Sequence, residues 1–390
     1  MILILNFDFN NHLFVVSSST TLSITTDKEA LNSLKSQLSN NETSSSHPLS
    51  SWSHNSSPCN WTGVLCDKHN QRVTGLDLSG FGLSGNLSPY IGNMSSLQSL
   101  QLQDNQITGF IPNQITKLYS LRVLNMSSNR FEGVLPSNLT NLNELQVLDL
   151  SSNKIVSRIP EDISSLKKLQ TLKLGRNSLY GTIPATLGNI SSLKNISFGT
   201  NFLRGWIPID LGRLHNLIEL DLTLNNLTGT VPSVVYNLSS LVNLALAANS
   251  FWGEIPYDVG HKLPKLLVFN FCFNKFTGRI PGSLHNLTNI RVIRMAYNRL
   301  EGTVPPGNSF NGSIPSSIGR LSGLKLLNLS RNSISGEVPK ELGQLEELQE
   351  LYLDGNKISG SIPYSLGNSS NSVWTAKATG ITKISHLLIT

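Results

Sequence analysis

Residues 97–112 read LQSLQLQDNQITGFIP, and residues 217–232 read LIELDLTLNNLTGTVP. Both stretches follow the pattern LxxLxLxxNxLxGxIP, whose asparagine recurs along the chain at a constant spacing of 24 residues. The regularly spaced asparagines are Asn105, Asn129, Asn153, Asn177, Asn201, Asn225 and Asn249. Repetition sustained over this length indicates a stack of coils, in which each repeat buries its apolar face against its neighbours.

The order of residues within a repeat predicts its local structure. The leucines of LxL point inward from a short strand, and the residues between them point outward to the concave face of the stack. The asparagine carries donors and an acceptor that can satisfy backbone groups where the chain turns away from the strand. We therefore expect a curved, right-handed leucine-rich-repeat solenoid of the α/β class, with a parallel sheet on its concave face and a helical cap at its N-terminal end.

The outer half of each repeat, LxGxIPxxLGxL, is expected to form loops or short 3₁₀ turns. It is too short and too rich in glycine and proline for a full helix. One repeat differs in length, because the step from Asn249 to Asn274 is 25 residues and the segment GHKLPKL carries one residue more than its counterparts.

Four segments are expected along the chain. Residues 1–23 are apolar but interrupted by polar residues, and they are expected to act as a signal peptide. Residues 24–70 should form the N-terminal cap. Residues 71–367 should form about 12 coils with a phase break near residues 299–311, and residues 368–390 should form an irregular tail.

The cap sequence predicts a helix followed by a disulfide. Thr26 and Glu29 have the spacing of a capping box. The apolar stripe of the predicted helix consists of Ala30, Leu31, Leu34 and Leu38. Trp52 and Trp61 are expected to pack between this helix and the first coil.

The three cysteines of the chain have two expected roles. Cys59 and Cys66 lie just before the first repeat and are expected to form a disulfide, the alternative being two free thiols. Cys272 falls two residues before a ladder asparagine and should face the concave side. It is interpreted as a plain unpaired thiol, with a reactive thiol or pairing between chains as alternatives.

After Asn298 the 24-residue spacing of the repeats is interrupted, and we call this interruption the phase break. Only ten residues later, Asn308 begins a second copy of the same half-repeat, and the LxxLxL strand between the two copies is missing. Exposing two apolar coil faces costs far more than lengthening a surface loop. The strand in 324–330 should therefore stack directly on that in 290–296, and residues from Glu301 to Asn311 should bulge outward.

Composition and motifs argue against several classes of protein. The net charge is +6, but Lys and Arg are scattered without a basic run, so nucleic-acid binding is not expected. No run of about 20 apolar residues predicts a membrane span. The eight histidines are dispersed, and neither metal-ligand spacing nor a G-x-S-x-G motif occurs. We therefore expect no enzyme activity, no metal and no cofactor in this chain.

Sequons of the form N-x-S/T are dense and favour an extracellular protein, although an Asn- and Ser-rich sequence also produces them by chance. The chain is expected to be secreted to the apoplast, or to be associated with the plasma membrane if it is part of a longer receptor. The proposed glycosylation sites are Asn60, Asn93, Asn125, Asn138, Asn189, Asn195, Asn237, Asn286 and Asn328.

The cap segments DKEAL and SWSHNSSPCNWTGVLCD, followed by coils of the form LxxLxLxxNxLxGxIPxxLGxLxx, resemble the extracellular half of plant leucine-rich-repeat receptor-like Ser/Thr kinases. The group with the receptors for bacterial flagellin and elongation factor is the most similar, and the resemblance covers roughly residues 23–367. It implies a module that binds a peptide or microbial ligand on its concave or lateral face and recruits a short leucine-rich-repeat co-receptor kinase.

The kinase motifs of that family are missing from this sequence. It contains no glycine-rich loop, VAIK-type lysine, HRD or DFG. The resemblance therefore implies a truncated receptor ectodomain. The alternative is a secreted protein similar to the plant polygalacturonase inhibitors, but these close both ends with cysteine pairs, and no such pair occurs at the C-terminal end here.

Concave residues are expected two, four and six positions before each ladder asparagine, with a rim residue just before it. Sequons at Asn125, Asn195 and Asn328 fall on this face. If they are glycosylated, they leave a free window whose mixture of acids, amides, a cation and aromatics suits an extended peptide. The candidate ligand-binding residues in this window are Glu219, Asp221, Asn243, Asn270, Phe273, Arg294 and Tyr297. The alternative is that they are ordinary solvated strand residues.

Overall fold

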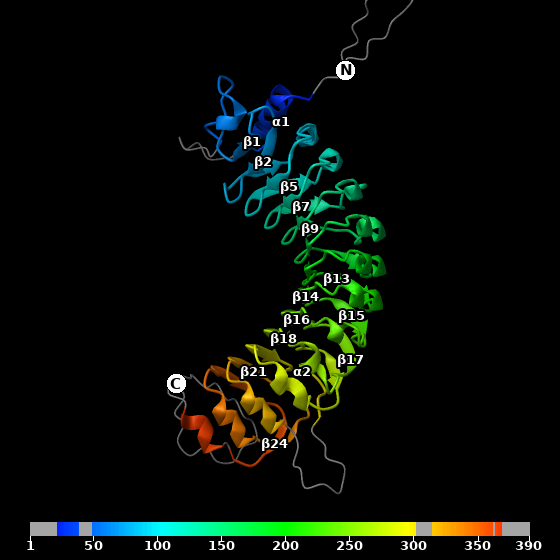
Figure 1. The fold of residues 1–390 in the computed structure, drawn as a ribbon, viewed down its shortest axis with the longest axis vertical. Coiled ribbons are helices and arrows are strands. Elements are labelled where there is room, and N and C mark those ends of the chain that lie inside the picture. Colours follow the sequence, from blue (N-terminus) through cyan, green and yellow to red (C-terminus); the bar gives the residue numbers. More distant parts are fainter. Residues whose placement is uncertain (1–21, 39–48, 302–313, 362, 369–390) are drawn as a thin grey trace, which may run out of the picture.

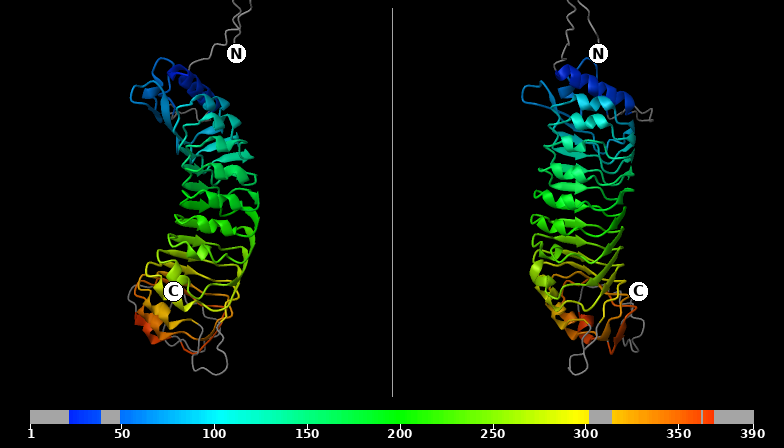
Figure 2. Two further views of the ribbon diagram at one scale, coloured as in Figure 1. Left: turned by 45° about the vertical axis from the view of Figure 1, so that its right-hand side comes forward. Right: turned by 90° about the vertical axis from the view of Figure 1, so that its right-hand side faces the viewer.

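The computed structural model describes residues 22–38, 49–301, 314–361 and 363–368. The coils stack into a curved arc that is closed at its N-terminal end by a helix (Figure 1, Figure 2). The expected curved solenoid with a parallel sheet is confirmed. The segments expected to form the signal peptide, the outward bulge and the tail lie almost wholly outside the described residues.

A 13-stranded sheet lines the concave side of the arc (Figure 1). β1 pairs antiparallel with β2, and from β2 onward each neighbour is parallel and comes from the next coil. The strands are β1 Val64–Cys66, β2 Val73–Asp77, β4 Ser99–Gln101, β6 Val123–Asn125, β8 Val147–Asp149, β10 Thr171–Lys173, β12 Asn195–Ser197, β14 Glu219–Asp221, β16 Asn243–Ala245, β18 Val268–Asn270, β20 Val292–Arg294, β21 Leu326–Asn328 and β23 Glu350–Tyr352. In β10, Leu172 is fully buried between half-buried Thr171 and Lys173, so the alternation predicted from LxL is present.

Ladder asparagines hold neighbouring coils together. Asn177 accepts the N–H of Ile155 at 3.0 Å and donates to the carbonyl of Leu150 at 3.0 Å in the preceding coil. It also donates to the Leu174 carbonyl of its own coil at 3.1 Å. The same arrangement occurs from Asn105 to Asn356. Each side chain thus satisfies backbone groups of two coils that would otherwise be buried without partners.

A second set of short parallel strands covers one lateral side of the stack, and we did not expect it from the sequence. These strands come from the LxG segment of each repeat and form a four-stranded, a five-stranded and a two-stranded sheet. The first comprises β3 Ser84–Asn86, β5 Gln106–Phe110, β7 Arg130–Gly133 and β9 Lys154–Ile155. The others comprise β11 Tyr180–Gly181, β13 Phe202–Gly205, β15 Asn226–Gly229, β17 Ser250–Glu254 and β19 Lys275–Thr277, and then β22 Ser335–Glu337 and β24 Lys357–Ser359.

Short 3₁₀ helices complete the coils, as predicted from the glycine and proline content. They are η2 Pro89–Asn93, η3 Asn113–Lys117, η4 Leu139–Asn141, η5 Glu161–Ser165, η6 Ala185–Asn189, η7 Ile209–Arg213, η8 Val235–Asn237, η9 Gly282–Asn286, η10 Ser316–Arg320, η11 Lys340–Gln344 and η12 Tyr364–Asn368. The repeat with one extra residue instead forms a single α-helical turn, α2 Val259–Lys262. The additional residue supplies the longer turn.

The cap begins with helix α1 (Ile24–Gln37), whose predicted stripe is buried. The capping-box prediction for Thr26 and Glu29 is wrong, because the helix starts earlier. Ser23 is the N-cap residue, with an extended backbone. Its N–H donates to Thr26 Oγ1 at 2.9 Å, so Thr26 acts as the third helical residue.

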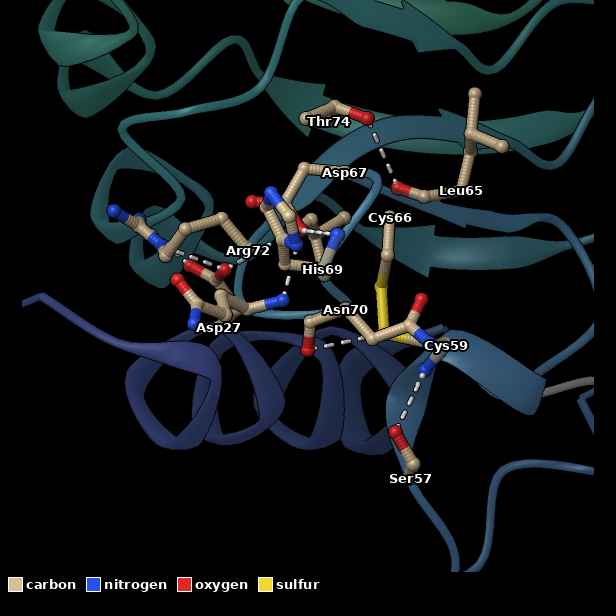
Figure 3. The surroundings of a disulfide bond; sticks show 12 residues. Asp27, Ser57, Cys59, Leu65, Cys66, Asp67, His69, Asn70, Arg72 and Thr74 are labelled. Atoms are coloured by element: carbon tan, nitrogen blue, oxygen red, sulfur yellow. Dashed lines mark hydrogen bonds and ion pairs between the residues drawn. A yellow bond between two sulfur atoms is a disulfide. The ribbon is translucent and has the colours of Figure 1, made fainter.

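An ion pair connects the cap to the first coil, and a disulfide closes a loop within the cap (Figure 3). Arg72 donates from Nε and Nη2 to the fully buried carboxylate of Asp27, both at 3.0 Å. The N–H of Val73, the first residue of β2, donates to the same carboxylate at 2.8 Å. The predicted disulfide between Cys59 and Cys66 is present, with a Cα–Cα distance of 5.5 Å. The disulfide therefore stabilises the cap internally, and the Asp27 carboxylate joins the cap helix to the first coil.

Trp52 and Trp61 have the packing role that we expected. Both are buried, and their rings stack with centroids 5.3 Å apart. Each indole N–H also has an acceptor, the Thr62 carbonyl for Trp52 and Ser56 Oγ for Trp61. Both rings therefore belong to the core of the cap, consistent with the preference of buried indoles for a partnered N–H.

The phase break is absorbed as predicted. β20 and β21 are parallel neighbours, with Val292 opposite Leu326 and Arg294 opposite Asn328. The ladder also continues across the junction, because Asn332 donates to the Met295 carbonyl at 3.0 Å. The two coils therefore stack as if they were consecutive in sequence.

Candidate functional site

The register of the concave sheet sorts the candidate residues into rows that run along the stack. Asp221, Ala245, Asn270 and Arg294 occupy one row in successive coils. Glu219 and Asn243 are neighbours in the next row, with Asn243 Nδ2 3.5 Å from Glu219 Oε1. The structure thus brings Asn270 beside Arg294 and Glu219 beside Asn243, whereas Ala245 separates Asp221 from Asn270.

Asp221 stabilises the turn that follows its own strand. Its Oδ1 accepts the N–H of Thr223 at 3.0 Å and the Thr223 hydroxyl at 2.7 Å. Asp149 makes the same pair of bonds with Ser151. One carboxylate oxygen of Asp221 is therefore committed to the turn that ends the strand, and only part of its acceptor capacity faces outward.

Two amide oxygens on the concave face have no hydrogen-bond partner among the described residues. They are Oδ1 of Asn243 and Oδ1 of Asn270, and both atoms are shielded from solvent. A buried acceptor without a donor costs free energy.

The rim of the concave face carries stacked aromatic rings. Phe273 and Tyr297 have ring centroids 4.2 Å apart and an interplanar angle of 13°. Their exposed fractions are 53% and 45%. The guanidinium of Arg331 lies 6.0 Å from the Tyr297 ring centroid. We call Phe273, Tyr297 and Arg331 the rim stack.

Arg331 is the functional candidate that sequence reasoning missed. It directly precedes the ladder asparagine Asn332, so it occupies the rim position of its coil. The window predicted from sequence ended at Tyr297, because the concave sequon at Asn328 closed it. The rim rule applied to Asn332 gives Arg331, and the junction places this residue in the coil next to Tyr297.

Small buried side chains lie between the rim stack and the row of Asn270 and Arg294. They are Ala247, Cys272 and Ala296, which form a cluster of their own on the concave side. Burial raises the pKa of the Cys272 thiol, and this thiol is unpaired. Cys272 faces the concave side as predicted. Its burial disfavours the thiolate form, which is the reactive form of cysteine.

The proposed glycosylation sites differ in their positions. Asn60, Asn93, Asn138, Asn189 and Asn237 are exposed, whereas Asn286 and the three concave sites are half-buried. Asn125 Oδ1 accepts the N–H and the hydroxyl of Ser127, and Asn328 does the same with Ser330. These are the turn bonds that Asp221 makes in its coil, so the turn by itself favours N-x-S at these positions.

The lateral sheet exposes a group of aromatic side chains, which we call the lateral aromatic patch. Its members are Tyr180, Phe202, Trp206 and Trp252. Trp206, with an exposed fraction of 72%, lies over Gly229 of the next coil, where a Cβ would come within 2.6 Å of the ring. An exposed apolar surface of this kind commonly marks a protein contact.

Neither a metal site nor a membrane span is found among the residues that the structure describes. Within the described ranges, no group of three His, Cys, Asp or Glu side chains is placed to hold a metal ion. None of the helices in the part of the chain that the structure describes is both long and apolar enough to span a bilayer.

Family profiles match most of the repeat region. The leucine rich repeat N-terminal domain matches residues 24–67, and the leucine-rich repeat region matches residues 77–202. Leucine rich repeat profiles also match residues 216–238 and 307–358. The last match crosses the end of the phase break.

Similar proteins are plant receptor kinases. The LRR receptor-like serine/threonine-protein kinase EFR of Arabidopsis thaliana is 46% identical over 89 residues, which are 23% of this chain and 8% of that protein. The crystal structure of PEPR1-AtPEP1 has a TM-score of 0.76 and 31% identity, and covers 91% of this chain and 52% of that chain. The chain therefore spans about half of the PEPR1 structure.

A further solved structure contains a peptide. It is the Arabidopsis receptor kinase HAESA ectodomain in complex with an N-terminally extended IDA peptide hormone ligand. Its TM-score is 0.62 and its identity 26%, with 90% of this chain and 70% of that chain covered.

Proposed function

This chain belongs to the leucine-rich-repeat proteins of the plant receptor-kinase ectodomain type, and we propose that it is an extracellular recognition module that binds an extended peptide on its concave face. The contact surface in this proposal comprises Asn243, Asn270 and Arg294 together with the rim stack. It carries no catalytic step of its own.

The observation that carries the proposal is the exposed rim stack, which lies beside half-buried amide side chains of the concave strands. Asn243 and Asn270 are half-buried and lie one coil apart on β16 and β18, and an extended peptide presents backbone polar groups along its length. Phe273 and Tyr297 offer a rigid aromatic surface for a ligand side chain, of the kind that often contributes most binding energy. Polar acceptors and aromatic anchors therefore lie on the same few coils.

The charged residues along the concave surface predict the orientation of the bound peptide. Glu219 and Asp221 lie on β14, while Arg294 lies on β20, three strands further along the sheet, and Arg331 one coil beyond. An extended peptide would place its cationic part over β14 and its anionic part over β20. Complementary charge of this kind improves specificity and association rate more than affinity.

The lateral aromatic patch is the second contact surface in this proposal. It lies on strands β11 to β17, away from the concave rows, so a short co-receptor ectodomain can bind there while a peptide occupies the concave face. Aromatic residues are enriched at such interfaces. Replacing Phe202 and Trp206 by serine should abolish co-receptor recruitment and leave peptide affinity unchanged.

The test uses the secreted protein and fractionated plant and microbial peptides, with binding measured by interferometry. A triple variant, Asn270→Ala with Arg294→Ala and Tyr297→Ala, should lose binding while its melting temperature stays close to the wild type. Asp221 is left intact, because its turn bonds make an alanine variant ambiguous. Equal binding by the triple variant would overturn the concave site, and inhibition of fungal polygalacturonases would assign the protein to the inhibitor class instead.

A further inference from the structure

A groove of about 800 Å³ opens at the N-terminal end of the solenoid, where α1 packs on η2. Its lining mixes polar and apolar surface and includes the polar side chains of Glu29, Asn32, Ser36 and His54. Its volume falls within the range of roughly 300–1,000 Å³ that is typical of small-ligand sites. The groove is remote from the concave site, so peptide binding does not account for it.

The groove is also lined by a residue that can be modified. Asn93 begins the sequon Asn93-Met94-Ser95, is exposed, and belongs to the lining. Tyr90 lies three residues earlier in the same 3₁₀ helix, with an exposed fraction of 57%. Because a 3₁₀ helix has three residues per turn, the side chains of Tyr90 and Asn93 leave the helix on the same face.

Other sequons at the same position of the repeat lack this arrangement. Asn189, Asn237 and Asn286 are each the last residue of a short helix, as Asn93 is. The residues three places before them are Thr186, Val234 and Ser283, and none has a ring. Asn93 is thus the one of these four sequons that combines an aromatic neighbour with the groove beside the cap helix.

We propose that an N-linked glycan on Asn93 occupies this groove and fastens the cap helix to the first coil. The apolar face of the first sugar lies on the Tyr90 ring, and its hydroxyl and acetamido groups bind the polar side chains of α1. The inference rests on the extracellular location in the proposed function, because N-glycans are attached in the secretory pathway.

The attachment is a group transfer with a lipid-linked oligosaccharide diphosphate as donor. The bond between the anomeric carbon of the first sugar and the phosphate oxygen breaks, and a bond from that carbon to Nδ2 of Asn93 forms. Nδ2 loses one proton, and the lipid diphosphate leaves. Asn93 Oδ1 keeps its acceptor capacity.

The bound glycan would add to a small set of polar links between α1 and the rest of the protein. Asp27 binds Arg72, and Lys35 Nζ donates to the Trp52 carbonyl at 2.6 Å. Ser33 Oγ lies 2.9 Å from Ser88 Oγ at the start of η2. A sugar in the groove would contact the exposed end of this same interface.

The experiment starts from the full chain secreted by plant cells. Glycopeptide mass spectrometry should show occupancy at Asn93. Under native conditions an endoglycosidase should release the Asn93 glycan roughly fivefold more slowly than the Asn189 glycan, the factor expected from a stacking contact of about 1 kcal/mol. Tyr90→Ala should remove that difference, whereas the matched control Thr186→Ala should leave release at Asn189 unchanged.

Hydrogen exchange supplies a second measurement. Amides of residues 24–37 should exchange roughly fivefold faster in Asn93→Gln than in the wild type, and Asn189→Gln should have no such effect. The same Asn93→Gln change in protein made without glycosylation should leave exchange unaltered, which separates the glycan from the side chain.

The outcomes are distinguishable. An unoccupied Asn93 in a protein glycosylated elsewhere overturns the inference and leaves the proposed function intact. Equal release at Asn93 and Asn189 also overturns it. A secreted protein without glycan on any sequon likewise overturns the inference alone, whereas a chain that plant cells neither secrete nor glycosylate contradicts the extracellular assignment on which both rest.

Discussion

Phe273 and Tyr297 stack with ring centroids 4.2 Å apart, although they belong to different coils. Both have a φ of 54°, in the left-handed region that non-glycine residues seldom adopt. Each directly precedes a ladder asparagine, Asn274 or Asn298, whose side chain fixes the turn through backbone bonds to two coils. Because rim residues share this conformation, their side chains leave neighbouring coils in the same direction and can stack.

Tyr297→Ala removes the middle member of the rim stack. We expect peptide affinity to fall by at least roughly tenfold, since aromatic anchors at recognition surfaces commonly contribute about 2 kcal/mol. The side chain is half-exposed, so the free energy of unfolding should change by less than about 1 kcal/mol. Calorimetric titration and thermal unfolding measure the two effects. Tyr180→Ala, on the lateral sheet, is the control, and an equal loss of affinity there would contradict the concave site.

Asn332→Ala tests the junction at the phase break. The side chain bonds the Leu300 N–H and the Met295 carbonyl across that junction. Losing these partners leaves buried backbone groups unsatisfied, at about 1–3 kcal/mol each. Amide exchange in residues 290–300 should therefore accelerate. Asn249→Ala is the matched change in an uninterrupted coil, and it should have a similar effect on its own neighbours. Unchanged exchange in Asn332→Ala alone would mean that the two coils do not stack stably.

Asp27→Ala should destabilise the cap more than any surface change. It leaves the Arg72 guanidinium unpaired and the buried Val73 N–H without an acceptor. We expect the free energy of unfolding to fall by about 2–4 kcal/mol, because the remaining partner of a buried pair is desolvated without a compensating interaction. Denaturant unfolding monitored by the fluorescence of Trp52 and Trp61 measures it. The exposed pair of Lys168 and Glu144 offers a contrast, and Glu144→Ala should cost far less.

Tyr236→Phe should leave stability unchanged or raise it by up to about 1 kcal/mol. The Tyr236 side chain is buried beside Phe271, and its hydroxyl has no hydrogen-bond partner in the described part of the chain. Removing the hydroxyl relieves a desolvation cost without opening a large cavity. Tyr236→Ala should instead lower the free energy of unfolding by about 3–5 kcal/mol, because it leaves a cavity where the buried ring was. A destabilised Tyr236→Phe variant in chemical unfolding would show that the hydroxyl has a partner.

Cys272 should react slowly with thiol reagents in the folded protein. Burial raises the pKa of its thiol, so at about pH 8 the folded state holds less of the reactive thiolate than an ordinary cysteine with a pKa of about 8.5. Labelling should speed up as the pH rises toward the raised pKa, and also on unfolding. The rate is measured with an alkylating reagent and mass spectrometry. Rapid labelling of native protein at about pH 7 would contradict the buried position.

Much of this fold could be predicted from the sequence. The 24-residue spacing of asparagines from Asn105 to Asn249 predicted the parallel concave sheet, and the spacing of Cys59 and Cys66 predicted the disulfide. The missing strand after Asn298 predicted that β21 would pair with β20. These features repeat or lie close together in sequence, so residue type and spacing alone carry them.

The candidate site could be predicted only in outline. Positions before each ladder asparagine placed Asn270, Arg294 and Tyr297 on the concave side, but their individual contacts were not readable. The turn bonds of Asp221 and the stack of Phe273 on Tyr297 depend on side-chain rotamers and on the distance between coils. Arg331 reached the rim stack only because two coils close over the phase break.

The sequence by itself determined the repeat, because each coil obeys the same local rule: leucines must be buried, and the asparagine must satisfy the backbone at the turn. Only the tertiary structure decided which side chains of different coils touch. Asp27 meets Arg72 across 45 positions of sequence, and Tyr297 meets Arg331 across the phase break. Such contacts depend on how α1 packs on the first coil and how coils stack, and no spacing within one repeat specifies either arrangement.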